Sequence, residues 1–158
     1  MSPLLAPFLK EHLARELSSL ALIGQCEQSD AARPPQVFIG DLPAKRRERD
    51  AREIPCVVIV PFSGFQQEGS CVTEVALICA VYNREEGDGE GLEGDMALLL
   101  NAVSRALMPC ANGIPLGRRF NLCPDNKGRL LPWSKDEKQL QPFLQATMTS
   151  TWTCKGWE

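Results

Sequence analysis

The sequence predicts an α+β fold, in which an antiparallel or mixed sheet of about four to five strands carries two amphipathic helices packed on one face. Two segments have apolar residues at helical spacing, at least four have the character of strands, and strands and helices do not alternate regularly. A chain of 158 residues suits one domain, which buries roughly 70% of the surface that the unfolded chain exposes. We therefore expect a single α+β domain over residues 1–158.

The first expected element is an amphipathic helix over about residues 3–23. Ser2 and Pro3 suit its first turn, although Pro7 offers an equally good start one turn later, and Gly24 suits its C-cap. His12 lies near the apolar stripe, and because no matched nucleophile is apparent we expect a packed or partly exposed side chain rather than a catalytic one. The stripe consists of Phe8, Leu9, His12, Leu13, Leu17 and Leu20.

A polar loop over residues 25–35 precedes a short strand at residues 37–39, and a second loop follows at about residues 40–53. This second loop contains a run of mixed charge, for which a solvated loop is the ordinary interpretation and a contact surface for an acidic partner is the alternative. No aromatic residue is interleaved with the run, which argues against binding of single-stranded nucleic acid. Its basic residues are Lys45, Arg46, Arg47, Arg49 and Arg52.

Two long strands are expected next. Residues 54–61 form a continuous apolar run rich in β-branched residues, which is typical of a buried strand. Residues 71–82 are apolar on both faces except at Glu74 and predict a central strand. A polar loop from Ser63 to Gly69 would join the two strands as an antiparallel hairpin with a wide turn.

The segment 84–95 is dense in glycine and in acidic residues, among them Glu85, Glu86, Asp88 and Glu90. We expect a loop, because the spacing of an EF-hand calcium site is absent. A second amphipathic helix follows, with Glu93 and Asp95 at its positive end and Pro109 beyond its last turn. Its apolar stripe consists of Met96, Leu99, Leu100, Val103 and Leu107.

The last third of the chain predicts a strand at residues 118–122 and a polar loop at about residues 124–141, within which residues 128–133 suit another strand. The final strand, Gln145 to Cys154, has a strict period of two. One face carries Ala146, Met148, Ser150, Trp152 and Cys154, and the other carries Thr147, Thr149, Thr151 and Thr153. A row of threonines is soluble and can form hydrogen bonds, but it contains no catalytic group. We expect this row on the open side of the sheet or against a neighbouring subunit.

Composition excludes several classes of function. A net charge of −3 argues against a dedicated nucleic-acid-binding protein, since phosphate binding requires a basic surface. The apolar runs are too short to cross a bilayer, and the charges among the first residues are not those of a signal peptide, so a cytoplasmic protein is expected. The seven cysteines include no closely spaced pair, so we expect reduced core residues and no zinc site. No nucleotide-binding, metalloprotease or serine-hydrolase motif occurs, so we expect no catalytic residue and no cofactor.

Several segments together resemble the tail terminator, or tail completion, proteins of long-tailed phages and prophages. They are VFIGDLPAK at 37–45, PCVVIVPFSG at 55–64, the end of the strand at 81–82, the helix around 98–107 and MTSTW at 148–152. The resemblance covers most of the chain from about residue 36. The cysteine content and the polar segment 125–141 depart from the family pattern.

The resemblance implies a non-enzymatic hexameric ring that caps the tail tube, stops its polymerisation and joins the neck or head-completion protein. Such a protein would be made in the host cytoplasm and become part of the virion at the head–tail junction, with the genome passing through the ring without sequence-specific contact. We expect the basic residues at 45–52 to contact a neighbouring subunit or the tube. The acidic residues Glu85, Glu86, Asp88 and Glu90 would face the opposite partner or the lumen.

Three alternatives remain open from the sequence. The nearest is another head–tail connector, such as a neck or head-closure protein. A small ligand-binding enzyme would require a pocket with convergent polar groups. A monomeric regulatory domain would form no oligomer.

Overall fold

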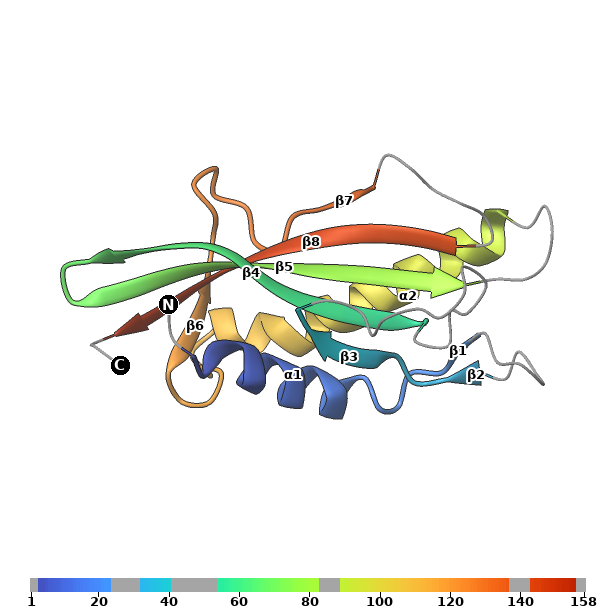
Figure 1. Ribbon diagram of the computed structural model, residues 1–158, viewed down its shortest axis with the longest axis horizontal. Helices are drawn as coiled ribbons and strands as arrows, with labels where there is room; N and C mark the ends of the chain where they lie inside the picture. Colours follow the sequence, from blue (N-terminus) through green and yellow to red (C-terminus); the bar gives the residue numbers. More distant parts are fainter. Residues whose placement is uncertain (1–2, 24–31, 41–53, 83–88, 137–142, 156–158) are drawn as a thin grey trace.

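The computed structural model describes residues 3–23, 32–40, 54–82, 89–136 and 143–155 (Figure 1). It has an α+β fold with two α-helices, a mixed six-stranded sheet and a separate two-stranded sheet within these residues. The elements in chain order are α1 (Leu5–Glu16), β1 (Leu22–Ile23), β2 (Ala32–Arg33), β3 (Gln36–Ile39), β4 (Cys56–Gln67), β5 (Ser70–Tyr82), α2 (Gly89–Leu107), a 3-10 helix (Met108–Ala111), β6 (Phe120–Cys123), β7 (Trp133–Lys135) and β8 (Phe143–Lys155).

The main sheet has the strand order β3-β4-β5-β8-β6, and β7 also pairs with β8. Strand β3 is parallel to β4, and the other pairs are antiparallel. The predicted central strand is confirmed, because β5 lies in the middle of this order and pairs with β8 along its whole length. The outer side of β8 is shared by β7, which pairs with residues 146–148, and β6, which pairs with residues 151–154.

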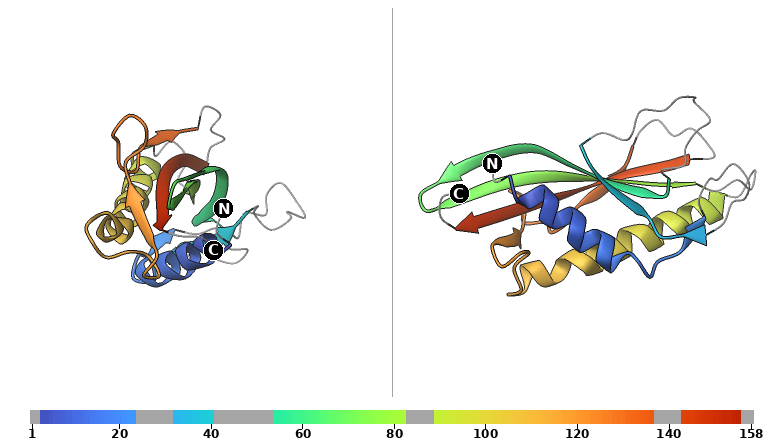
Figure 2. Two further views of the ribbon diagram at one scale, coloured as in Figure 1. Left: turned by 90° about the vertical axis from the view of Figure 1, so that its left-hand side faces the viewer. Right: turned by 60° about the horizontal axis from the view of Figure 1, so that its bottom comes forward.

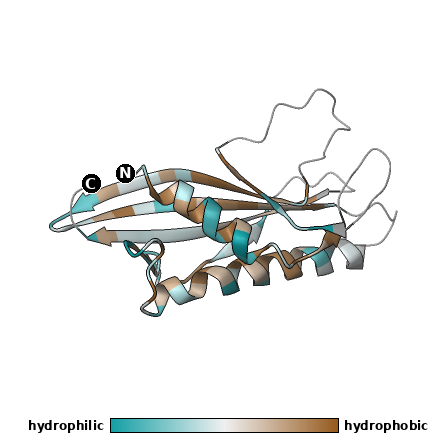
Figure 3. Cartoon of the chain, turned by 90° about the horizontal axis from the view of Figure 1, so that it is seen from below, coloured by the Kyte–Doolittle hydropathy of each residue, from teal (hydrophilic) through white to brown (hydrophobic). Residues whose placement is uncertain are grey.

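Both helices cover the same face of the sheet, as the right panel of Figure 2 shows. The strand residues on this face include Val57 of β4, Leu77 of β5 and Met148 of β8, which share one buried core with Leu9 of α1 and Leu99 of α2. In Figure 3, which is coloured by hydropathy, apolar positions (brown) recur along both helices. Each large side chain buried here contributes roughly 1.5–3 kcal/mol to folding.

The first helix is shorter than the predicted span of residues 3–23. Helix α1 ends at Glu16, and the backbone N–H of Leu17 still donates to the Leu13 carbonyl. The next turn tightens because the Ser18 N–H and hydroxyl both donate to the Arg15 carbonyl. The chain then enters β1, which pairs with β2 rather than continuing the helix.

The hairpin of β4 and β5 is confirmed, but its predicted polar loop is wrong. Strand β4 continues through a bulge between Pro61 and Ser63 and ends at Gln67. The turn therefore contains only Glu68 and Gly69, and Gly69 has a φ of 76°. Cross-strand pairing with β5 keeps this polar segment extended.

The second helix begins earlier than predicted. Helix α2 starts at Gly89, so the second half of the predicted acidic loop is helical. Its C-terminal end agrees with the prediction, because Leu107 is its last residue and Pro109 lies in the following 3-10 helix. The predicted strand at 118–122 is observed as Phe120–Cys123. The strand suggested at 128–133 is displaced: residues 128–132 are not in a strand, and β7 begins only at Trp133.

A tight approach of glycine to an aromatic ring holds α1 against the loop before β6. Gly117 has a φ of 57°, and a Cβ atom added to it would lie 2.5 Å from Cδ2 of Phe8. The Phe8 ring in turn packs edge-on against Phe120, with 6.1 Å between the ring centroids. A side chain at position 117 would therefore displace a ring that joins α1 to β6.

We expect Leu100→Asp to abolish soluble folding. Leu100 is buried in the helix–sheet core, and an unpaired carboxylate there costs several kcal/mol, a large fraction of the roughly 5–15 kcal/mol that stabilises a domain. Soluble yield and thermal melting measure the effect. Asn101→Asp, at the exposed neighbouring position, is the control, and a Leu100→Asp variant with the wild-type melting temperature would refute the assigned face of α2.

We expect Gly117→Ala to lower the free energy of unfolding by about 1–3 kcal/mol more than Gly113→Ala does. Gly113 also has a positive φ, 92°, but an added Cβ atom there meets no atom within 4 Å. The pair therefore separates the clash with Phe8 from backbone strain. Chemical denaturation measures both variants, and equal losses would contradict the close contact.

Candidate assembly surface

The turn end of the β4–β5 hairpin forms an arm, defined here as residues 61–73. The arm extends beyond both helices, as Figures 1, 2 and 3 all show. Strand β3 pairs only with residues 56–59 of β4. Among the described residues, no strand lies beside the outer edge of β4 from Val60 to Gln67.

The outer strand of the arm is exposed, aromatic and uncharged. From Phe62 to Gln67 every residue is exposed, and Phe62 and Phe65 have exposed fractions of 54% and 51%. An open depression of about 430 Å³ lies at this position. It is lined by Pro61, Phe62, Ser63, Gly64, Phe65, Gln66 and Cys71. Exposed apolar side chains next to an open sheet edge are typical of a protein–protein contact.

Local sequence explains the shape of the arm. Pro61 lacks an N–H group and is tolerated on an edge strand, at the point where β3 has ended. The bulge that follows adds one residue to β4 and increases its local twist. Gly64 lies close to β5, because an added Cβ atom would be 3.0 Å from the Val72 carbonyl oxygen. These features allow β4 to remain paired with β5 without support from β3.

The two faces of β8 are confirmed as predicted. Ala146, Met148, Ser150, Trp152 and Cys154 are buried on the helix side. The threonines lie on the opposite face; Thr147, Thr149 and Thr153 are half-buried, and Thr151 is buried. Thr147 donates a hydrogen bond of 3.0 Å from its hydroxyl to Asp136, next to β7. The threonine row of β8 and Phe65 of the arm therefore lie on the same face of the sheet, on either side of β5.

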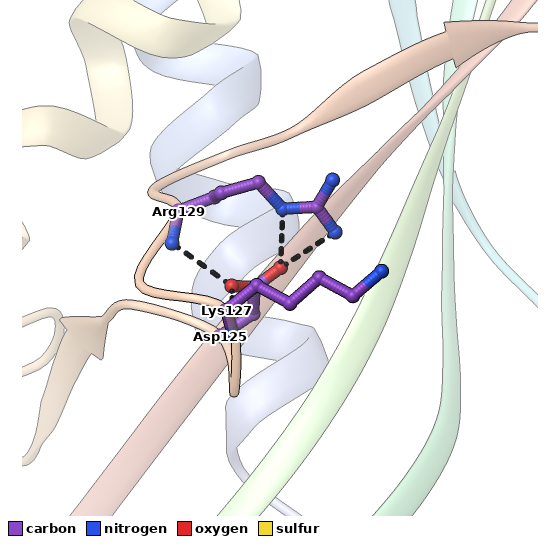
Figure 4. Close-up of polar contacts among 3 residues, drawn as sticks. All are labelled: Asp125, Lys127 and Arg129. Atoms are coloured by element: carbon purple, nitrogen blue, oxygen red, sulfur yellow. Dashed lines mark hydrogen bonds and ion pairs between the residues drawn. The ribbon is translucent and has the colours of Figure 1, made fainter.

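The turn between β6 and β7 is held together by the side chain of Asp125. Asp125 Oδ1 accepts hydrogen bonds from the backbone N–H groups of Lys127 and Arg129, both at 2.9 Å, and Oδ2 accepts from Nε and Nη2 of Arg129 at 3.0 and 2.9 Å (Figure 4). These contacts, led by the backbone hydrogen bond from Arg129, lower the pKa of Asp125 below its ordinary value of 3.8. The turn is thus closed by one carboxylate and precedes the exposed Leu130 and Trp133.

The charged residues singled out in the sequence are not part of this described surface. Lys45, Arg46, Arg47, Arg49, Arg52, Glu85, Glu86 and Asp88 lie outside the described residues. Glu90 lies in the first turn of α2, where only its backbone is described. Their proposed contacts remain predictions. The exposed Phe62 and Phe65 were missed, although aromatic residues in the run PFSGFQQ were a usable signal for an edge strand.

The reactive side chains are mostly engaged in packing. His12 is half-buried, as expected, and its Nε2 lies 2.6 Å from the Ala106 carbonyl oxygen, which links α1 to α2. None of the six described cysteines takes part in a disulfide. Burial, with a smaller contribution from Cys56, raises the pKa of Cys79 from 9.0 to about 12, and burial also raises the pKa values of Cys110 and Cys123. Few thiolates form under these conditions at neutral pH.

The described residues contain no group of three or more His, Cys, Asp or Glu side chains that could hold a metal ion. Within the same ranges, no helix combines the length and the apolar character needed to span a membrane.

Comparison with protein-family models found no match to this chain, and a search of curated proteins found none either.

We expect the Asp125 carboxyl to titrate below pH 3.8 in the folded protein, as measured by NMR of its side-chain carbon. A folded pKa below the unfolded value means that this stabilisation is complete above the unfolded pKa and is lost as the pH falls through the folded pKa. Arg129→Gln removes the charged partner and should raise the Asp125 pKa toward its ordinary value. An unchanged pKa in this variant would contradict the contribution of Arg129.

Proposed function

We propose that this chain is a structural virion assembly protein, a tail terminator that caps the tail tube of a long-tailed phage or prophage. In this proposal it has no reactive centre and acts through contacts between protein surfaces. The family assignment rests on the sequence segments that resemble tail terminators. The observation that carries the assembly role is the exposed, uncharged aromatic strand at residues 62–67 of the arm.

This strand suits a contact with protein better than a small-molecule site. A ligand pocket usually encloses its ligand and presents a few convergent polar groups. Here the depression is open, and two half-exposed phenylalanine side chains contribute to its lining. Burying both rings against a partner would remove a large apolar surface from water, which is favourable for association.

The open face of the sheet supports a second contact. The threonine row of β8 offers uncharged hydroxyl groups at Thr149 and Thr153, which are half-buried, whereas Thr151 is buried and Thr147 donates to Asp136. Hydroxyl groups can exchange hydrogen bonds with water for hydrogen bonds with a neighbouring subunit at little net cost. A ring built from identical copies would use such lateral surfaces and, by closing, would prevent unlimited growth.

The two charged segments of the sequence are assigned to further contacts in this proposal. The basic residues Lys45, Arg46, Arg47, Arg49 and Arg52 would contact a neighbouring subunit or the tube, and Glu85, Glu86, Asp88 and Glu90 would face the opposite partner or the lumen. Opposite charges at the two ends of a ring would orient it between two partners, since electrostatic complementarity determines orientation more than affinity.

We expect the purified chain to cap tubes formed by the tail tube protein of the same genome, and to hold their length when it is added during assembly. Electron microscopy of tubes assembled with and without the chain measures both effects. Replacing all five basic residues of 45–52 by glutamate should abolish capping, because the contact would become repulsive. Replacing five exposed basic residues outside the arm by glutamate, namely Lys10, Arg15, Arg105, Arg118 and Lys127, is the matched control.

Capping by the charge-reversed variant with normal tube length would contradict the role of the basic residues. Tubes that reach the same length with and without the wild-type chain would contradict the terminator function itself. Binding to filled heads without binding to tubes would instead identify a neck or head-closure protein.

A further inference from the structure

The outer edge of β4 presents backbone groups that can pair with another strand. Gln67 and Ser70 close the hairpin, and Phe65 is opposite Val72. Because backbone groups of successive strand residues point in alternate directions, residues 65 and 67 direct theirs toward β5. Gly64 and Gln66 therefore direct their N–H and C=O groups away from the sheet.

The other edges of the main sheet are shorter or partly occupied in the described residues. Strand β3 has four residues and β7 has three. The outer side of β6 is blocked at Phe120, whose N–H donates to Leu116 and whose carbonyl accepts from Leu116, at 3.0 and 2.8 Å. Among the edges of the main sheet in the described residues, the outer edge of β4 is therefore the longest one available for pairing, and a second copy of the chain presents the same edge.

We propose that two copies of the free protein pair through their arms, with β4 of one copy antiparallel to β4 of the other and the two-fold axis at Phe65. This contact forms in the free protein, before it meets any partner, and it uses the same aromatic strand that the proposed tail contact uses. The interface is isologous and self-complementary.

The register follows from the alternation of the backbone groups. With the axis at Phe65, Gly64 of each copy is opposite Gln66 of the other, and each pair exchanges two main-chain hydrogen bonds. The pairing uses only residues beyond the bulge between Pro61 and Ser63. It also places the long Gln66 side chain over a glycine, where no side chain obstructs it.

The side chains fit this axis. Phe65 is opposite its own copy at a non-hydrogen-bonded position, where Cα atoms approach to about 4.5 Å and side chains meet most closely. A two-fold axis brings a residue close to itself, so a charge near it would repel its own copy. Residues 61–67 carry no charge; Glu68 lies in the turn, and Glu74 lies on the next strand, β5, opposite Ser63.

The test is the mass of the full chain in solution, measured by light scattering after gel filtration over a concentration series. We expect a dimer of twice 17.4 kDa that dissociates on dilution. Phe65→Lys should weaken the dimer at least about tenfold, because it replaces a ring contact by two like charges at the axis. Trp133→Lys, at a position of nearly equal exposure on β7, is the matched control and should leave the dimer intact.

Cysteine cross-linking tests the register without relying on a charge. Phe65→Cys should form a covalent dimer under mild oxidation, since disulfides join Cα atoms about 4.4–6.8 Å apart. Ser63→Cys should not exceed the wild-type background, because residue 63 lies opposite residue 67 and about 13 Å from its own copy. Melting curves establish that each variant is folded.

A wild-type chain that is monomeric at every concentration would overturn the proposal. An oligomer of any size that Phe65→Lys leaves unchanged would overturn it as well. Equal cross-linking by Phe65→Cys and Ser63→Cys would exclude this register. Loss of tube capping with an intact dimer would count against the tail function alone.

Discussion

The burial of two helices on one face of the sheet is the constraint on which the rest of the structure depends. Strands β5 and β8 pair over their whole length, so their alternate side chains form one continuous apolar surface beneath α1 and α2. Two polar side chains within this layer are paired: the Trp152 indole N–H donates to the Ser150 hydroxyl, which donates to the Val75 carbonyl. Because an unsatisfied buried donor costs about 1–3 kcal/mol, this short chain of hydrogen bonds allows a large aromatic ring in the core. Once the helices occupy this face, the threonine row must lie on the other one.

The elements that sequence alone predicted well are those whose hydrophobic pattern agrees with their tertiary position. The period of two in β8 assigned each face correctly, and the apolar spacing in α2 identified Leu99, Leu100 and Val103 as core residues. The errors occur where tertiary contacts override local preference. Gly89, Gly91 and Gly94 each disfavour a helix by about 1 kcal/mol relative to alanine, yet they lie in the first turns of α2. Pairing with β5 likewise keeps Ser63 and Gly64 extended, although both are typical turn residues.

The candidate surface was harder to predict than the fold, for a related reason. A run of charged residues can be recognised from the sequence alone, so residues 45–52 and 84–95 were the predicted contact segments. An edge strand is defined by the absence of a neighbour, and this depends on where β3 ends relative to β4. The bulge after Pro61 also breaks the period of two that would have identified residues 62–67 as a strand. Phe65 therefore lay within the predicted loop, and the aromatic rings of Phe62 and Phe65 were the remaining signal for a strand.

The arm combines features that limit association with features that permit it. Pro61 and the bulge obstruct pairing at the base of the edge, as expected for a protein that must avoid open-ended sheet growth. Beyond them, Gly64 and Gln66 leave one short segment that can pair, and a two-fold contact there is closed, since each copy uses the same edge. A cyclic ring, by contrast, requires two different surfaces on each copy. If arm pairing and ring formation compete for the same strand, the paired form would keep the aromatic strand covered until a template that binds more tightly releases it. The balance between the two forms would then depend on protein concentration and on the presence of the template, and under the proposed tail function it would link the time of capping to the availability of a tube.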